Sequence, residues 1–286
     1  MSDTGPESSA PPASRGAAGR RLRRLGGGAG NERERPPVGR ASALVRPRAG
    51  AFAALAVMLG LYYRFHASLP NTSTWGDVAV LAFVVMPAVL LLVYLALPVR
   101  TAPVVQLLLV AAAFALLAVL LHQAGLDALA DFAKLGAMAF VAFWFLGFFE
   151  ALSWVVLVAC IVPWVDAYSV WRGPTNHIVH EHEHVFSTLS FAFPVPGEHS
   201  AANLGLPDLL FFGLFLAAAA RFRLRVRTTW ALLAASFGAT IAIAVGWGKA
   251  GLPALPLLSL AFLLANADLL WRTLRPANRS SRSLGA

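Results

Sequence analysis

The sequence predicts an all-α fold, a polytopic bundle of about eight transmembrane helices preceded by a disordered N-terminal tail. Composition is the first reason: 58% of the 286 residues are hydrophobic and only 13% are charged, with a mean hydropathy of +0.67. A soluble domain of this length does not need so much apolar surface. The distribution of basic residues, in the tail and in short connections, is the second reason, because membrane insertion favours it.

The first segment, residues 1–48, is rich in Gly, Pro, Ser, Ala and Arg and has few large apolar side chains. It buries too little surface to offset its conformational entropy, so we expect it to be disordered. It also lacks the pattern of a secretory signal peptide. Its arginines could bind nucleic acid or anionic lipid. We favour a cytoplasmic tail that fixes membrane orientation, and expect no nucleic-acid partner.

Apolar segments that can cross about 30 Å of hydrocarbon follow the tail. The expected spans are 50–66, 76–98, 102–122, 128–148, 150–171, 204–220, 228–248 and 252–271. A turn over residues 147–150 divides the longest apolar run. Three further regions therefore follow the tail: N-terminal transmembrane helices over 49–148, a C-terminal transmembrane half over 149–272, and a short basic tail over 273–286.

Charge predicts the orientation of these spans. With the arginine tail inside, the inner connections contain Arg100 and the arginines of 221–227, while the outer connections receive Asp77, Asp131 and Lys134. Arg64 and Arg172 also fall on the outer side and are exceptions to this pattern. The positive-inside rule then places both termini in the cytoplasm of a multi-pass protein, which we assign to a bacterial cytoplasmic membrane. The single cysteine excludes an intrachain disulfide.

Acidic residues inside apolar spans are the candidate functional groups. Asp268 lies four residues before Arg272, a spacing that predicts a local ion pair. Asp166 and Asp208 have no Lys or Arg within one helical turn. Their spans are consecutive and antiparallel, and both carboxylates fall near the outer ends, so they could face each other.

Two carboxylates that lie close together in a site of low dielectric cannot both ionise, and they share one proton. One then acts as a base and the other as an acid, which is the chemistry that activates water for attack on an amide. Two alternatives remain open at this point. The acids could be separate hydrated residues that line a cavity, or part of a proton relay in a transporter.

Three segments, 165–179, 204–222 and 252–258, resemble the presenilin and signal peptide peptidase family of intramembrane aspartyl proteases. That family has one aspartate in a Tyr-Asp pair, a second in Gly-x-Gly-Asp, and a Pro-Ala-Leu motif in its last helix. Asp166 matches the first motif, Asp208 with Gly205 matches the second, and Pro253, Ala254 and Leu255 match the third. The resemblance implies catalytic aspartates at 166 and 208. The residues that would shape the site are Gly205, Pro207, Pro253, Ala254 and Leu255.

Two positions depart from the family motifs. Val165 replaces the tyrosine, and Pro207 replaces the second glycine, although proline is well tolerated in the first turn of a helix. The departures favour, as an alternative, a catalytically silent relative that binds transmembrane helices. The resemblance otherwise implies an aspartic endopeptidase without a cofactor. Its substrates in the bilayer would be transmembrane helices or remnant signal peptides, and a homo-oligomer is left open.

The long connection over residues 172–203 carries a second signal. His180, His182 and His184 alternate, so an extended strand would place three imidazoles on one face, where they could hold Zn²⁺ or Ni²⁺. Alternating His and Glu is also ordinary loop composition. With the intramembrane acids, the histidines support a metal- or proton-coupled transporter as the third hypothesis. The same connection is long enough to pair with the backbone of an unwound substrate.

Overall fold

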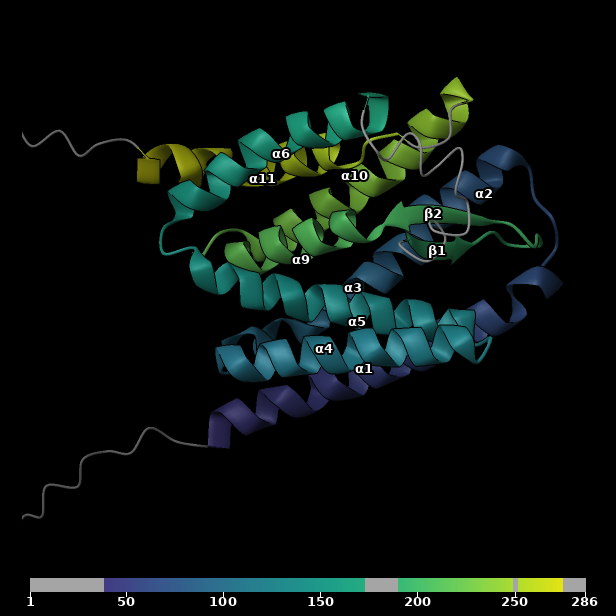
Figure 1. The fold of residues 1–286 in the computed structure, drawn as a ribbon, viewed down its shortest axis with the longest axis horizontal. Coiled ribbons are helices and arrows are strands. Elements are labelled where there is room, and N and C mark those ends of the chain that lie inside the picture. Colours follow the sequence, from purple (N-terminus) through teal and green to yellow (C-terminus); the bar gives the residue numbers. More distant parts are fainter. Residues whose placement is uncertain (1–38, 173–189, 249–251, 275–286) are drawn as a thin grey trace, which may run out of the picture. The chain divides into compact units, whose positions relative to one another are not determined.

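The computed structural model describes residues 39–172, 190–248 and 252–274, which are almost entirely helical (Figure 1). The helices are α1 (Gly39–Phe65), α2 (Thr74–Val80), α3 (Met86–Ala96), α4 (Val104–Gln123), α5 (Asp127–Phe145), α6 (Leu152–Arg172), α9 (Leu206–Arg221), α10 (Val226–Trp247) and α11 (Leu255–Leu274). A π-helical segment, Leu81–Val85, joins α2 to α3, and a 3-10 turn, Leu97–Thr101, follows α3. Every apolar segment predicted from the sequence therefore contains a helix.

Six helical stretches in the described part of the chain are long and apolar enough to cross a membrane. They are Thr74–Thr101, Val104–Gln123, Asp127–Phe148, Leu152–Ser169, Val226–Trp247 and Leu255–Thr273. The chain is therefore an integral membrane protein rich in transmembrane helix. The helix α9 has 16 residues and is roughly 24 Å long, which is shorter than the hydrocarbon layer.

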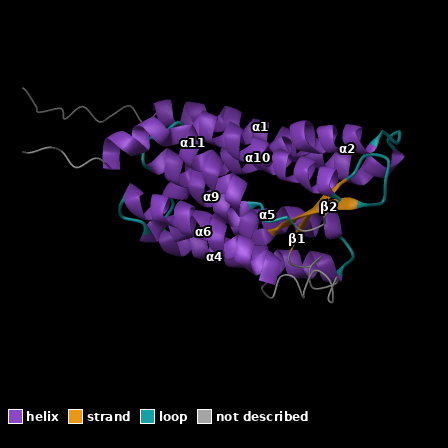
Figure 2. Ribbon diagram, turned by 90° about the horizontal axis from the view of Figure 1, so that it is seen from above, coloured by secondary structure: helices purple, strands orange, loops and turns teal. Residues whose placement is uncertain are grey.

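Two elements of the fold differ from the sequence predictions. Helix α1 begins at Gly39, inside the segment expected to be disordered, while residues 1–38 and 275–286 lie outside the described residues. The second difference is a β-hairpin at the end of the connection expected to be a loop. Its strands are β1 (Ser190–Pro194) and β2 (Ala201–Gly205), the orange elements of Figure 2. The two strands pair antiparallel, with Phe191 opposite Leu204 and Phe193 opposite Ala202.

Helix α9 lies in the hydrophobic core and follows directly from the hairpin. Its residues from Phe212 to Ala219 are buried, and it contacts α5, α10 and α11. Small residues bring α5 and α9 close together, since a Cβ added at Gly213 would lie 2.9 Å from the Cβ of Ala142. Interhelical packing in a bilayer depends on such close approach. The first turn of α9 is consequently held in place from both sides, by the core behind it and by the hairpin before it.

Candidate active site

Asp208 lies in the first turn of α9, immediately after strand β2. The strand ends at Gly205, which is the N-cap residue of α9 with extended backbone angles of φ −62° and ψ 142°. Pro207 lies in the first turn and is exposed, at a position where its missing N–H has no intrahelical acceptor to reach. The Asp208 carboxylate accepts a hydrogen bond from the backbone of Gly205, which satisfies the N-cap N–H in the manner of a capping box.

Glycine at position 205 leaves room for this arrangement. A Cβ added at Gly205 would lie 3.1 Å from Oδ2 of Asp208 and 3.6 Å from Cδ of Pro207. The first of these distances is tighter than ordinary van der Waals contact between such atoms. The absence of a side chain at Gly205 therefore lets the Asp208 carboxylate fold back over the start of its own helix.

Asp166 is half-buried on α6 and is bonded to the Pro-Ala-Leu segment. Its Oδ2 accepts a hydrogen bond from the backbone N–H of Leu255, at 3.1 Å. Leu255 is the first residue of α11, so this N–H is one of the donors that a helix cannot satisfy internally. A carboxylate at a helix N-terminus is also stabilised by the helix dipole. Ala254 and Leu255 are buried and Pro253 is half-buried, which keeps the donor in a fixed position.

The two aspartates and the Pro-Ala-Leu segment come together at one site. Asp208 is close enough to Asp166 for the charge on Asp166 to act on it. Helix α6, which carries Asp166, contacts both α9 and α11. Among the described residues, no Lys, Arg or His forms an ion pair with either carboxylate. Each carboxylate thus accepts one backbone N–H, from Leu255 for Asp166 and from Gly205 for Asp208.

Val165, at the place of the family's tyrosine, is 61% exposed on α6. Its neighbour Trp164 is also exposed, at 78%, so this part of α6 has an open apolar surface. In a bilayer such a surface contacts lipid or another helix. Val165 therefore belongs to the surface of α6, whereas Asp166, the next residue, is bonded inward to Leu255.

Asp268 and Glu150 are acidic residues outside the site, and the structure agrees with the expectation for only one of them. The predicted ion pair of Asp268 with Arg272 is wrong: Asp268 Oδ2 pairs instead with Nη2 of Arg225 at 2.7 Å. Arg225 lies just before α10, and its backbone N–H also donates to Oδ1 of Asn266 on α11 at 3.1 Å. A partner on a neighbouring helix has thus replaced the local one. Glu150 is exposed at the connection between α5 and α6, within the turn expected over residues 147–150.

The sequence analysis missed a buried ion pair on α5. Asp131 and Lys134 were assigned to an outer connection, yet both lie on α5, where Nζ of Lys134 is 2.9 Å from Oδ1 of Asp131. Their side chains are only 8% and 11% exposed. The spacing of three residues within an apolar helix was the available signal, because an ionisable pair inside a span marks a functional or structural site.

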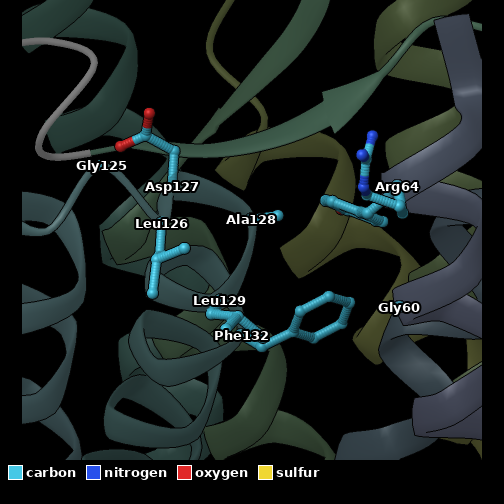
Figure 3. A pocket seen from close by; sticks show the side chains of 9 residues that line it. Gly60, Arg64, Gly125, Leu126, Asp127, Ala128, Leu129 and Phe132 are labelled. Atoms are coloured by element: carbon cyan, nitrogen blue, oxygen red, sulfur yellow. The ribbon is translucent and has the colours of Figure 1, made fainter.

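A cavity of about 440 Å³ lies beside α1 and the start of α5, away from the aspartates (Figure 3). Its lining is mostly apolar, with Phe132 of α5 extending toward the helix that carries Gly60 and Arg64. The residues around it are Gly60, Tyr63, Arg64, Gly125, Leu126, Asp127, Ala128, Leu129 and Phe132. Neither Asp166 nor Asp208 is among them, so this cavity is not the space in which the two carboxylates would act.

The metal hypothesis rested on His180, His182 and His184, which lie outside the described residues. In the part of the chain that the structure describes, no three His, Cys, Asp or Glu side chains are grouped to hold a metal ion.

No model of a protein family matches this chain, and no curated protein matches its sequence.

Proposed function

We propose that this chain is an intramembrane aspartyl endopeptidase that hydrolyses peptide bonds within transmembrane helices or remnant signal peptides. One observation carries the proposal: Asp208 lies close enough to Asp166, on a different helix, for the charge on Asp166 to act on it, and Asp166 is bonded to Leu255 of the Pro-Ala-Leu segment. Three segments that resemble one protease family are separated by long stretches of sequence. Their meeting at a single site is what a shared catalytic function requires.

The chemistry follows from a pair of carboxylates with one proton. The ionised carboxylate of the pair takes a proton from a water molecule as the water oxygen attacks the peptide carbonyl carbon. The protonated carboxyl donates its proton to the carbonyl oxygen, which gives a tetrahedral diol. In the collapse of the diol, the carboxyl that took a proton from water donates a proton to the leaving nitrogen, and the C–N bond breaks. The other carboxylate takes a proton from a diol hydroxyl, which restores the singly protonated pair.

A helical substrate must unwind before its amides can reach this pair, because a helix hides them in internal hydrogen bonds. Strand β2 lies next to the site, since it ends at Gly205, three residues before Asp208. Ala201 and Asn203 on this strand are exposed. An unwound substrate segment that adds a strand beside β2 would therefore bring its backbone to Asp208.

The proposal includes the membrane topology. With α1 and α9 counted, eight helical segments cross the bilayer and both termini lie in the cytoplasm. Arg225 and Asp268 then lie at the inner surface, and the hairpin and both catalytic aspartates lie toward the outer surface. The orientation matches that of signal peptide peptidase, and substrates would have the corresponding direction in a bacterial cytoplasmic membrane.

The test is cleavage of a fluorogenic transmembrane peptide by the purified full-length protein in lipid, with and without a transition-state inhibitor of aspartyl proteases. We expect cleavage that the inhibitor blocks. Inhibitor binding without cleavage of any of several peptides would favour the silent helix-binding relative. If the protein neither cleaves the peptides nor binds the inhibitor, the protease assignment is wrong, and proton flux in liposomes would then test the transporter.

Replacing Gly205 by alanine should slow cleavage about tenfold while leaving the fold intact. The added Cβ would lie 3.1 Å from Asp208 Oδ2 and would push the carboxylate from its position, although alanine accepts the backbone angles of Gly205 without strain. Gly60→Ala is the matched control, because a Cβ there meets nothing within 4 Å. Initial rates and thermal unfolding of both variants give the comparison. Equal rates for the two variants would contradict the role assigned to Gly205.

A further inference from the structure

The outer edge of strand β1 is bonded to side chains rather than to another strand. Ala192 donates its N–H to Oδ2 of Asp131 at 3.3 Å, and its carbonyl accepts the hydroxyl hydrogen of Tyr63 at 2.9 Å. Two residues before it, the carbonyl of Ser190 accepts from Nζ of Lys134 at 3.0 Å. A strand added at this edge would have to displace all three side chains.

The last residue of β1 completes this pattern. The carbonyl of Pro194 accepts a hydrogen bond from the hydroxyl of Tyr62 at 2.6 Å, and a proline has no N–H to offer. Residues 190, 192 and 194 are spaced by two, so they share one side of the strand. The outward-facing carbonyls of all three residues, and the N–H of Ala192, are consequently bonded to side chains of helices α1 and α5.

Strand β2 presents the opposite situation. In the antiparallel register, Ala192 faces Asn203 and Pro194 faces Ala201, so Asn203 and Ala201 also direct their backbone groups out of the hairpin. On that side neither residue has a backbone partner among the described residues. At Gly205, the third residue with this direction, the backbone is bonded to Asp208. The open edge of the hairpin therefore leads to the site.

We propose that Tyr63, Asp131 and Lys134 are positioning residues that close the β1 edge of the hairpin, so that an unwound substrate strand adds only to β2, beside Asp208. The inference rests on the proposed function and specifies how the substrate is directed. A two-stranded hairpin has two edges, and each can accept a strand. A strand on β1 would lie one strand further from Asp208, in contact with α1 and α5.

Several interactions together hold the edge of β1 against helices α1 and α5. Asp131 and Lys134 form an ion pair with each other, and each also bonds to β1. Tyr63 adds ring contacts, with its centroid 4.9 Å from that of Phe132 and 6.4 Å from that of Phe191. The hairpin is thus attached to α5 by charge-assisted hydrogen bonds and to α1 by an aromatic side chain that is itself buried.

The experiment uses the full-length protein in lipid and a transmembrane peptide that carries a photoreactive leucine next to the scissile bond. Cross-linked residues are identified by mass spectrometry in the Asp208→Asn background, which is designed to leave the peptide intact. Products of cleavage are identified in the active background. The variants are Tyr63→Phe and Lys134→Met, separately and together, with Lys134→Arg as the conservative replacement and Tyr94→Phe on α3 as the control for loss of a tyrosine hydroxyl.

We expect wild-type cross-links over residues 201–205. In the combined variant we expect the ratio of cross-links on β2 to those on β1 to fall at least fivefold, with a second cleavage product. Lys134→Arg, which keeps the positive charge, and Tyr94→Phe should both leave the ratio as in wild type. A purely structural role for the three residues would lower every product in proportion and leave the ratio as in wild type, which would overturn the inference.

Amide hydrogen exchange supplies a measurement that does not need a substrate. Asp131→Ala leaves the N–H of Ala192 without its acceptor, so exchange at this amide should accelerate at least tenfold, and unchanged exchange would overturn the closed edge. A wild-type protein that neither cleaves nor cross-links the peptide would instead overturn the proposed function, together with the role in directing substrate. If exchange at Ala192 still accelerated in Asp131→Ala, the only conclusion left would be that Asp131 holds β1 against α5.

Discussion

Replacing either Asp166 or Asp208 by asparagine is expected to lower the rate of peptide cleavage by about 10²–10⁴-fold, the usual contribution of a positioned acid or base. Asparagine has nearly the size of aspartate and its side-chain oxygen still accepts hydrogen bonds. Asp166→Asn can therefore keep its bond to the N–H of Leu255 while losing the ability to exchange a proton. The loss of rate would then report chemistry and not the position of α11.

The matched control is Asp127→Asn at the start of α5. Asp127 is a carboxylate with 72% of its side chain exposed, and it bonds to a histidine, His122, at 2.8 Å. Its replacement should change the rate less than twofold. Wild type and Asp127→Asn should share a bell-shaped dependence of rate on pH, because one carboxylate of the active pair must be ionised and the other protonated. Substantial cleavage by Asp166→Asn or Asp208→Asn would remove that residue from the mechanism.

The apolar spans could be read from the sequence because each is dictated locally. A run long enough to cross the hydrocarbon layer must satisfy its own backbone hydrogen bonds, and a helix does this within the segment. The expected segment 204–220 and the observed helix Leu206–Arg221 therefore differ by only one or two residues at either end. Pro207 even marks the first turn, where proline is favoured. The start of α1 at Gly39 was not predicted, because the Arg, Gly and Pro residues around it have the composition of a disordered tail.

The hairpin could not be read with the same ease, because its second strand has almost no pattern. In β1, Phe191 and Phe193 alternate with smaller residues, which is a period-two signal. The strand Ala201–Gly205 consists of small and polar residues and one leucine, and its pairing is determined by β1 and by α9. Strand pairing depends on register and on burial of one face, and neither is visible in so short a segment.

In the candidate site, too, the local features could be predicted from the sequence and the contacts between helices could not. The sequence identifies Asp166 and Asp208 as acids without a local cation, and the predicted order of the spans places both toward the same end of the bundle. Spacing along the chain could not reveal the partners supplied by other helices. Asp268 illustrates this, because its true partner is 43 residues away while the expected one was four. The Asp131–Lys134 ion pair is local, with a spacing of three residues on one helix. It was overlooked because both residues were counted as part of a connection outside the membrane.

Removing the backbone N–H of Leu255 should have the second-largest effect on cleavage. Leu255→Pro deletes the donor to Asp166, and proline is favoured at the first position of a helix, so α11 can still begin there. The residue before a proline avoids helical angles, and Ala254 lies before the helix. A hydrogen bond to a charged group contributes about 1.5–3 kcal/mol. Its loss from the active arrangement should slow cleavage by about 10–100-fold.

The control must account for the leucine side chain, which is only 4% exposed. Leu255→Ala removes most of that side chain and leaves the N–H in place, so it carries the cost of lost packing alone. The ratio of rates between Leu255→Ala and Leu255→Pro therefore isolates the hydrogen bond to Asp166, and unfolding temperatures of the two variants should be similar.

Combining each with Asp166→Asn and measuring affinity for the transition-state inhibitor extends the comparison, because the two variants should differ less once the charge on residue 166 is gone. Equal rates for alanine and proline would mean that the Pro-Ala-Leu segment acts through shape alone. The N–H of Leu255 would then have no part in holding the catalytic carboxylate, and α11 would merely close one side of the site.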